Sequence, residues 1–307
     1  MASITGLVAA THTPFAADGR LYLDAAAPLV DRLVADGVAG LFVCGSTGEG
    51  MSLTADERRA TTAAFVAAAA GRVPVLAHVG HNSLAEARSL AAHAAEVGAD
   101  AVSATSPSYF KPNSVAALVD CAAEIAAGAP DLPFYYYHIP ALTGVNLDMV
   151  EFLTRAGERI PNLAGLKYTA PLLHEFQACR AEQDGRFDIL WGCDEMLLGA
   201  LATGARGAVG STYNIAAPLY RRLIDAFEDG NLEEARRLQA LSVQLVRTLS
   251  GFPFHAATKA VLKMRGIDVG TCRSPLATLA EADTARLRRQ LEEIGFFEWS
   301  GDAASAG

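Results

Sequence analysis

The 307-residue chain lacks the features of several specialised protein classes. Its five cysteines are scattered without a CxxC pair, which argues against a disulfide scaffold or zinc site and indicates reduced thiols in the cytoplasm. The longest apolar run, 63–70, is too short to cross a bilayer, and the first six residues do not resemble a signal peptide. Positive charge is not in excess: the net charge of −9 excludes a general attraction to nucleic acid or anionic membranes.

Lysine is scarce in this chain, which has only four among its 25 lysines and arginines. One of them, Lys167, lies in the apolar stretch LAGLKYT at 163–169, which is typical of a short buried strand. Unlike a guanidinium, a primary amine can lose its proton and attack a carbonyl carbon. The position therefore suggests a Schiff-base nucleophile. The alternative is a lysine at a strand end that extends its amine into water.

Strand and helix patterns alternate as far as about residue 225. Eight strands are predicted, at residues 6–10, 40–44, 73–79, 101–105, 134–137, 163–168, 189–191 and 207–210. The predicted helices include 24–36, 55–70, 84–97, 115–127, 195–203 and 218–228. Eight βα repeats predict an α/β fold, the (β/α)8 TIM barrel, whose chemistry lies at the C-terminal ends of the strands. An open, doubly wound sheet is the alternative, although it usually has fewer strands.

Beyond about residue 229 the sequence predicts helices only. Helices at 232–249, 255–265 and 281–294 predict a C-terminal three-helix appendage packed against the barrel. We therefore expect a catalytic barrel at 1–228, a helical extension at 229–300 and a disordered tail at 301–307.

Polar residues follow several of the predicted strands. The turn Gly45-Ser46-Thr47-Gly48-Glu49 offers backbone N–H groups and two hydroxyls, which suits a carboxylate or a phosphate, unless it is an ordinary Gly-Ser turn. Tyr137 ends the fifth strand and could relay protons beside a lysine, although core packing explains at least one of the three consecutive tyrosines. Thr169 shares a face with Lys167 because strand side chains alternate.

The seventh and eighth strands end in further polar groups. Gly192, Cys193, Asp194 and Glu195 follow the seventh, and Ser211 begins a hydroxyl-rich turn after the eighth. Paired carboxylates can act as acid and base, bind a metal or accept hydrogen bonds from hydroxyls, but they can also cap the next helix. His78 and His81 could join Asp194 as metal ligands, yet no HxH or HExxH motif is present, so no metal is expected. An amine, a phenol, a carboxylate-binding turn and an acid pair on one rim together suggest a class I aldolase for a 2-oxo acid and a sugar.

Three of these segments resemble a known family. The turn at 45–49, the segment from Tyr137 to Pro140, and Gly165-Leu166-Lys167 are similar to the dihydrodipicolinate synthase/N-acetylneuraminate lyase family of pyruvate-dependent barrels. The similarity extends from about residue 6 to about residue 276. FYYYHIPALTGV at 134–145 and GSTYN at 210–214 look most like the sialic acid lyases, especially their animal-type branch.

The resemblance implies a role for each matching residue. Lys167 would form the imine, Tyr137 would exchange a proton with the reacting hydroxyl, and Ser46 and Thr47 would hold the pyruvyl carboxylate and complete the proton relay. Tyr109 would reach the site of a neighbouring subunit. The sugar tail would be bound by Thr169, Gly192, Asp194, Glu195 and Ser211.

The implied reaction is the reversible cleavage of N-acetylneuraminate to N-acetylmannosamine and pyruvate, without metal or organic cofactor, in a homotetramer built as a dimer of dimers. Leu142 stands where the synthases carry an arginine, which disfavours dihydrodipicolinate synthase activity because leucine cannot pair with a second carboxylate. Another sugar acid, such as a 2-keto-3-deoxy sugar acid, is an alternative substrate. A non-enzymatic barrel that only binds sugar acids is the alternative from a different class.

Overall fold

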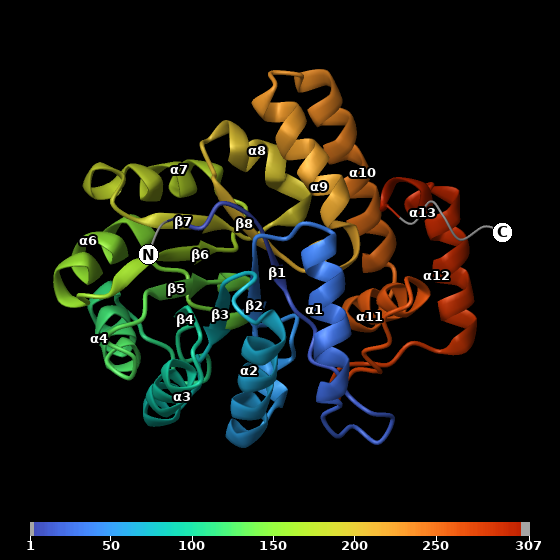
Figure 1. The fold of residues 1–307 in the computed structure, drawn as a ribbon. Coiled ribbons are helices and arrows are strands. Elements are labelled where there is room, and N and C mark those ends of the chain that lie inside the picture. The colour runs from blue at the N-terminus through green and yellow to red at the C-terminus, as the bar shows by residue number, and fades with distance from the viewer. Residues whose placement is uncertain (1–2, 302–307) are drawn as a thin grey trace.

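The computed structural model describes residues 3–301, in which eight parallel strands close into a barrel (Figure 1). Each strand pairs with its neighbours in sequence, and β8 closes the barrel against β1. The strands are β1 Gly6–Ala10, β2 Gly40–Val43, β3 Val75–His78, β4 Ala101–Ala104, β5 Phe134–His138, β6 Leu163–Tyr168, β7 Asp188–Trp191 and β8 Gly207–Gly210. All eight coincide with predicted strands to within two residues at either end, so the barrel is confirmed and the open sheet is excluded.

Helices surround the barrel between its strands (Figure 1). The α-helices up to β8 are α1 Ala26–Ala35, α2 Ala55–Ala69, α3 Leu84–Glu96, α4 Val115–Ala126, α5 Pro140–Thr143, α6 Met149–Arg159, α7 Leu173–Ala181 and α8 Leu197–Ala202. Those after β8 are α9 Tyr213–Glu228, α10 Leu232–Ser250, α11 Phe254–Met264, α12 Glu281–Glu293 and α13 Phe296–Trp299. Short 3-10 helices are η1 Leu23–Ala25, η2 Gly50–Ser52, η3 Glu182–Gly185 and η4 Asp194–Met196. None of the helices within residues 3–301 has the length and apolar character needed to cross a membrane.

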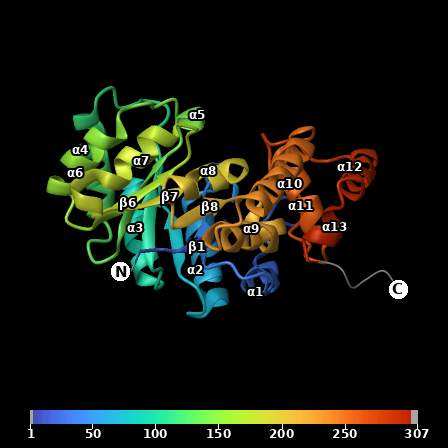
Figure 2. The same cartoon turned by 90° about the horizontal axis from the view of Figure 1, so that it is seen from above.

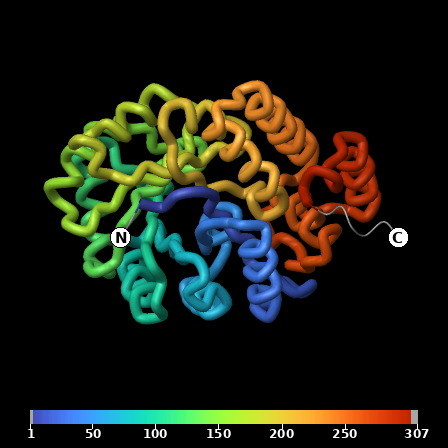
Figure 3. Tube along the Cα trace, turned by 45° about the horizontal axis from the view of Figure 1, so that its top comes forward, coloured from blue at the N-terminus to red at the C-terminus, as the bar shows by residue number. Residues whose placement is uncertain are grey.

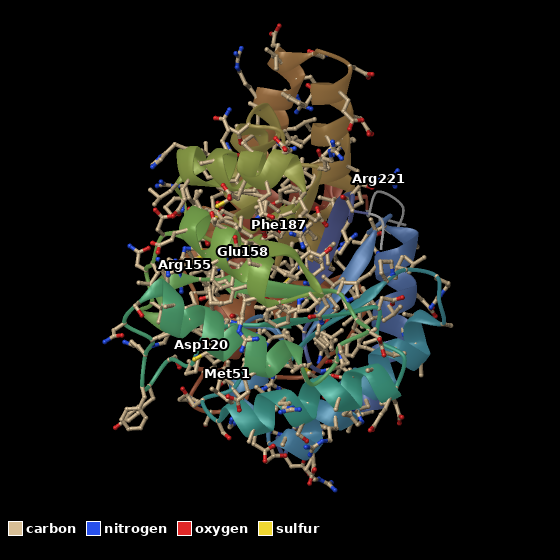
Figure 4. All side chains as sticks on the ribbon, turned by 90° about the vertical axis from the view of Figure 1, so that its left-hand side faces the viewer. Met51, Asp120, Arg155, Glu158, Phe187 and Arg221 are labelled. Carbon is tan, nitrogen blue, oxygen red and sulfur yellow. The ribbon has the colours of Figure 1, made fainter. Side chains whose placement is uncertain are left out.

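Each outer helix buries one face against the barrel. In α6, Phe152 and Leu153 are fully buried, whereas Arg155 and Glu158 are exposed and can be located in Figure 4. This spacing places the apolar residues on one side of a 3.6-residue helix. Local sequence also fixes the helix start in places: Thr54 and Glu57 form the complete capping box of α2.

The last four helices lie on one side of the barrel. Figures 2 and 3 show these orange and red segments beyond the strands. α10 packs against α9 and η4. Three of them, α10, α11 and α12, match the predicted appendage; the short α13 is additional. The division of the chain at residue 228 stays a prediction. Apart from Gly301, the predicted tail at 301–307 lies outside the described residues.

Several helices differ from the sequence prediction. None of the predicted ranges corresponds to α5, α6 or α7, and α9 begins at Tyr213, five residues before the predicted start at Pro218. Proline favours the first turn of a helix because it has no N–H to donate. Here it is accommodated inside α9 because the backbone leaves helical geometry at Ala216, with φ −146°.

Candidate active site

A cavity of about 270 Å³ opens at the C-terminal ends of the strands. All the predicted site residues except Tyr109 line it. The lining consists of Ala10, Ser46, Thr47, Tyr137, Ile139, Lys167, Thr169, Gly192, Cys193, Asp194, Glu195, Val209, Ser211, Val246, Phe254 and His255. Residues from six strands or the loops that follow them therefore meet at one point, as a parallel barrel requires.

Lys167 lies on β6 directly beside Tyr137 of β5. Its Nζ is 3.9 Å from the ring centroid of Tyr137 and 4.0 Å from that of Phe42, and only 4% of the residue is exposed. Burial of this degree excludes a lysine that extends into water. Within the described residues, its amine has no hydrogen-bond or ion-pair partner. The nitrogen is therefore placed between two aromatic faces and next to the cavity, where it can meet a carbonyl carbon.

The three consecutive tyrosines of β5 point to alternate sides. Tyr135 and Tyr137 lie inside the barrel, whereas Tyr136 packs outward against Phe152 at 4.7 Å between ring centroids. Tyr135 lies at the opposite end of the barrel from the site, beside a second cavity of about 330 Å³. There its hydroxyl donates to Asp188 at 2.9 Å, and the same carboxylate accepts the N–H of Ile4. Only Tyr137 is therefore available for chemistry at the mouth.

The turn after β2 is bonded to two distant parts of the chain. Thr47 Oγ1 lies 2.6 Å from Ser211 Oγ, which joins the turns after β2 and β8. The Ser46 carbonyl lies 3.0 Å from Nε2 of His255 on α11. The turn begins at Cys44, whose φ of +59° is in the left-handed region. These contacts hold the Thr47 hydroxyl and the Ser46 backbone at the cavity, which both residues line.

Asp194 is buried and bonded to the turn after β8. Its Oδ2 accepts hydrogen bonds from the backbone N–H of Thr212 at 2.8 Å and from the Thr212 hydroxyl at 2.6 Å. Burial raises the pKa of Asp194 to about 6, although the Thr212 bonds oppose the shift. Asp194 lies in the first turn of η4 and makes no capping bond, so the alternative is wrong as an N-cap, although both carboxylates are first-turn acids of that segment. Glu195, next in sequence, is exposed at the cavity.

Two glycines at the mouth permit close packing of polar groups. A Cβ at Gly192 would lie 2.0 Å from Thr169 Oγ1, and one at Gly210 would lie 2.0 Å from Asp194 Oδ1. Any side chain at either position would displace a predicted substrate-binding residue.

Tyr109 lies away from the cavity within one chain. It is 78% exposed, and its ring packs edge-to-face against Phe110, which is 86% exposed. The single chain therefore does not bring it to the other predicted residues.

Three residues of the cavity come from helices after the barrel and were not predicted as site residues: Val246 on α10, and Phe254 and His255 on α11. They belong to the helical extension, for which only packing against the barrel was expected. His255 is 209 residues from its partner Ser46, and no local pattern in the sequence indicates such a contact.

The metal-site alternative finds no support in the geometry. His78 contacts the backbone at Cys44 and Thr105, and His81 accepts the N–H of Ser83. Between residues 3 and 301, no cluster of three or more histidine, cysteine, aspartate or glutamate side chains is arranged to hold a metal ion.

The family model described as "Dihydrodipicolinate synthetase family" matches residues 3–294. The chain belongs to this family. It is 43% identical to an N-acetylneuraminate lyase of Xenopus tropicalis over 91% of this chain and 93% of that protein.

Solved structures of the family share the fold at different degrees of sequence identity. An N-acetylneuraminate lyase from Aliivibrio salmonicida superposes with a TM-score of 0.94 at 40% identity, covering 96% of this chain and 98% of that one. A dihydrodipicolinate synthase from Bacillus anthracis superposes with a TM-score of 0.89 at 29% identity, covering 95% and 99%. The barrel is thus common to relatives named for different reactions, so the choice between reactions depends on the side chains.

Proposed function

We propose that the protein is a class I aldolase that cleaves N-acetylneuraminate reversibly to N-acetylmannosamine and pyruvate. The observation that carries the proposal is the buried, unpartnered amine of Lys167 beside Tyr137 and the Ser46–Thr47 turn. The 43% identity to a relative named N-acetylneuraminate lyase favours this substrate.

The geometry supports the following sequence of steps. The Lys167 amine attacks C2 of the open-chain keto acid and expels water, which gives an imine whose protonated nitrogen accepts electrons. Tyr137 takes the proton of the C4 hydroxyl as the C3–C4 bond breaks, which releases the aldehyde and leaves an enamine. Protonation of C3 and hydrolysis of the imine then release pyruvate and restore the amine.

Separate parts of the cavity would hold the two halves of the substrate. The hydroxyls of Ser46 and Thr47 would bind the carboxylate of the keto acid. Thr169, Gly192, Asp194, Glu195 and Ser211 would bind the sugar hydroxyls. The exposed Leu142 brings no positive charge for a second carboxylate, which favours an uncharged aldehyde.

Borohydride trapping tests the imine. Wild-type protein reduced in the presence of pyruvate is expected to gain one pyruvate-derived group, located on Lys167 by peptide mass spectrometry. Absence of the adduct would instead favour a barrel that only binds sugar acids. Cleavage rates on N-acetylneuraminate and on a 2-keto-3-deoxy sugar acid then decide the aldehyde, and a faster rate on the second would reject the preferred substrate.

We also propose that the reaction uses neither a metal nor an organic cofactor, because the lysine imine itself accepts the electrons. Extended dialysis against a chelator is expected to leave the cleavage rate unchanged. A cytoplasmic location is proposed because the five cysteines are all free.

The exposed Tyr109 and Phe110 support an assembly proposal. Two adjacent aromatic side chains with 78% and 86% exposure in the single chain are typical of a surface that a partner protein covers. We infer that Tyr109 completes the site of a second subunit in a homotetramer built as a dimer of dimers. Sedimentation with activity measurement tests this, and a fully active monomer would refute it.

A further inference from the structure

Arg58 on α2 is a buried cation without an anionic partner among the described residues. Only 2% of it is exposed, and its guanidinium donates to two backbone carbonyls: Nη1 to Gly80 at 2.7 Å and Nη2 to His78 at 2.6 Å. Burial lowers the pKa of Arg58, and no carboxylate acts on it. Burying a charge without an opposite charge costs free energy, so a buried arginine at this position suggests a specific role.

The residue that Arg58 holds, His78, lies at the end of β3 and is fully enclosed. The backbone N–H of Thr105 lies 3.3 Å from Nε2 and can only donate, so Nε2 carries no proton. Arg58 Nη2, which can only donate, lies 3.3 Å from Nδ1 and would favour the other tautomer, but that tautomer gains this one bond and loses two. The proton of the neutral ring is therefore on Nδ1, which donates to the Cys44 carbonyl at 3.2 Å, while Arg58 donates to the His78 carbonyl. Burial, followed by the charges of Arg58 and Lys167, holds the pKa of His78 well below its usual value, in agreement with a neutral ring.

His78 thereby contacts both the start of the carboxylate-binding turn and the aromatic rings beside Lys167. Its Nδ1 holds the carbonyl of Cys44, the left-handed residue at which the Ser46–Thr47 turn begins. Its ring packs edge-to-face against Tyr137 at 5.8 Å and lies 6.0 Å from Phe42, and these are the two rings that flank Lys167 Nζ.

The Cys44 carbonyl oxygen is closely packed on the side of Gly50. A Cβ at Gly50 would lie 1.9 Å from the same oxygen. The carbonyl is therefore enclosed by Gly50 and His78, and the left-handed backbone at Cys44 is held by these neighbours.

We propose that His78 is a positioning residue that sets the carboxylate-binding turn through the Cys44 carbonyl, and that Arg58 fixes the backbone at His78. This inference rests on the proposed function, since it assigns the turn at Ser46 and Thr47 to the pyruvyl carboxylate. Neither residue lines the cavity, so both act through other residues.

A matched pair of variants tests the inference. In H78N the amide takes the place of Nδ1 and can still donate to Cys44, whereas in H78Q it takes the place of Nε2 and cannot. The readout is the pyruvate concentration that gives half-maximal borohydride trapping on Lys167. We expect this concentration to rise about tenfold or more in H78Q and to stay within about threefold of wild type in H78N, in line with the loss of one buried hydrogen bond.

The other outcomes are also decisive. Loss of packing alone would reduce the amount of folded protein, and hence the maximal adduct, equally in both variants without changing the half-saturating concentration; that result overturns the inference. If neither variant folds, R58K and R58M provide the second pair: R58M is expected to raise the half-saturating concentration more than R58K, and equal values would refute the role of Arg58. Failure of wild-type protein to form the adduct would refute the proposed function itself.

Discussion

Two buried lysines of this chain have opposite surroundings. Lys259 on α11 is 2% exposed, and its Nζ lies 2.7 Å from Glu49 Oε1, 3.0 Å from the Thr13 carbonyl and 2.7 Å from the Thr271 carbonyl. Lys167 is 4% exposed and has no such partner among the described residues; aromatic rings and a cavity surround its Nζ instead.

The comparison teaches that burial alone does not identify a reactive lysine. An ammonium group has three donors, and at Lys259 each has an oxygen partner. Burial lowers the pKa of Lys259, but the ion pair with Glu49 opposes the shift. Lys259 thus joins the helical extension to the barrel, whereas the Lys167 amine has no such oxygen partner among the described residues and faces the cavity, as the proposed imine requires.

Replacing Lys167 should give the largest effect. K167R keeps a cation but removes the nucleophile, so cleavage should fall by roughly 10⁴-fold or more, with no borohydride adduct. K263R is the matched control, because Lys263 is exposed and pairs with Asp268; its rate should stay within about twofold of wild type. A pyruvate adduct in K167R would show that another amine forms the imine and that the contrast between the two buried lysines does not identify the nucleophile.

Removing one hydroxyl separates the packing of the Tyr137 ring from the proton transfer proposed for it. Y137F keeps the aromatic face against Lys167 but cannot exchange a proton, so kcat should fall by roughly 10²- to 10⁴-fold. In Y136F, the altered ring faces the outer helices, and kcat should change by less than about threefold. Equal losses in the two variants would assign the tyrosines to packing rather than catalysis.

Replacing Lys259 should affect stability rather than chemistry. K259M leaves Glu49 buried without its cation, which should cost about 3–5 kcal/mol of unfolding free energy in urea titration. The double variant K259M/E49Q should recover part of this loss because no charge remains unpaired. The folded fraction of K259M should still form the pyruvate adduct, and unchanged stability would contradict the role given to the ion pair.

Asp194 is a buried carboxyl that interacts electrostatically with Lys167 and is hydrogen-bonded to Thr212. Its pKa is raised from 3.8 to about 6 by burial, so the folded state binds its proton more strongly than the unfolded state. Stability should therefore decrease as pH rises from about 4 to 6, by roughly 3 kcal/mol at about 1.4 kcal/mol per pKa unit.

D194N should lack this component of the pH dependence. The measurement is the unfolding free energy of both proteins at several values between pH 4 and pH 7. Parallel curves would show that Asp194 does not titrate as described.

The barrel was predictable because its signals are local. Each strand is a short apolar run bounded by turn residues, and alternation within β5 correctly placed Tyr135 and Tyr137 on one face and Tyr136 on the other. The start of α9 was mispredicted since Pro218 is an ordinary signal for a first helical turn, and the break at Ala216 that accommodates it depends on tertiary packing.

The site was predictable to the extent that it lies at strand ends. Lys167, Tyr137 and Thr47 follow directly from their positions, as the closing of the barrel brings all strand ends together. His255 could not be predicted, because its contact with Ser46 depends on how α11 docks. The role of Tyr109 depends on a second subunit and stays a prediction.

The wall formed by Val246 and Phe254 has a practical meaning for enzyme engineering. These side chains come from a short contiguous stretch outside the eight strands, so it can be randomised while the bond-breaking groups remain intact. If His255 is kept to support the turn, a library of variants over this stretch can be screened for new aldehyde substrates while the proposed catalytic residues stay unchanged.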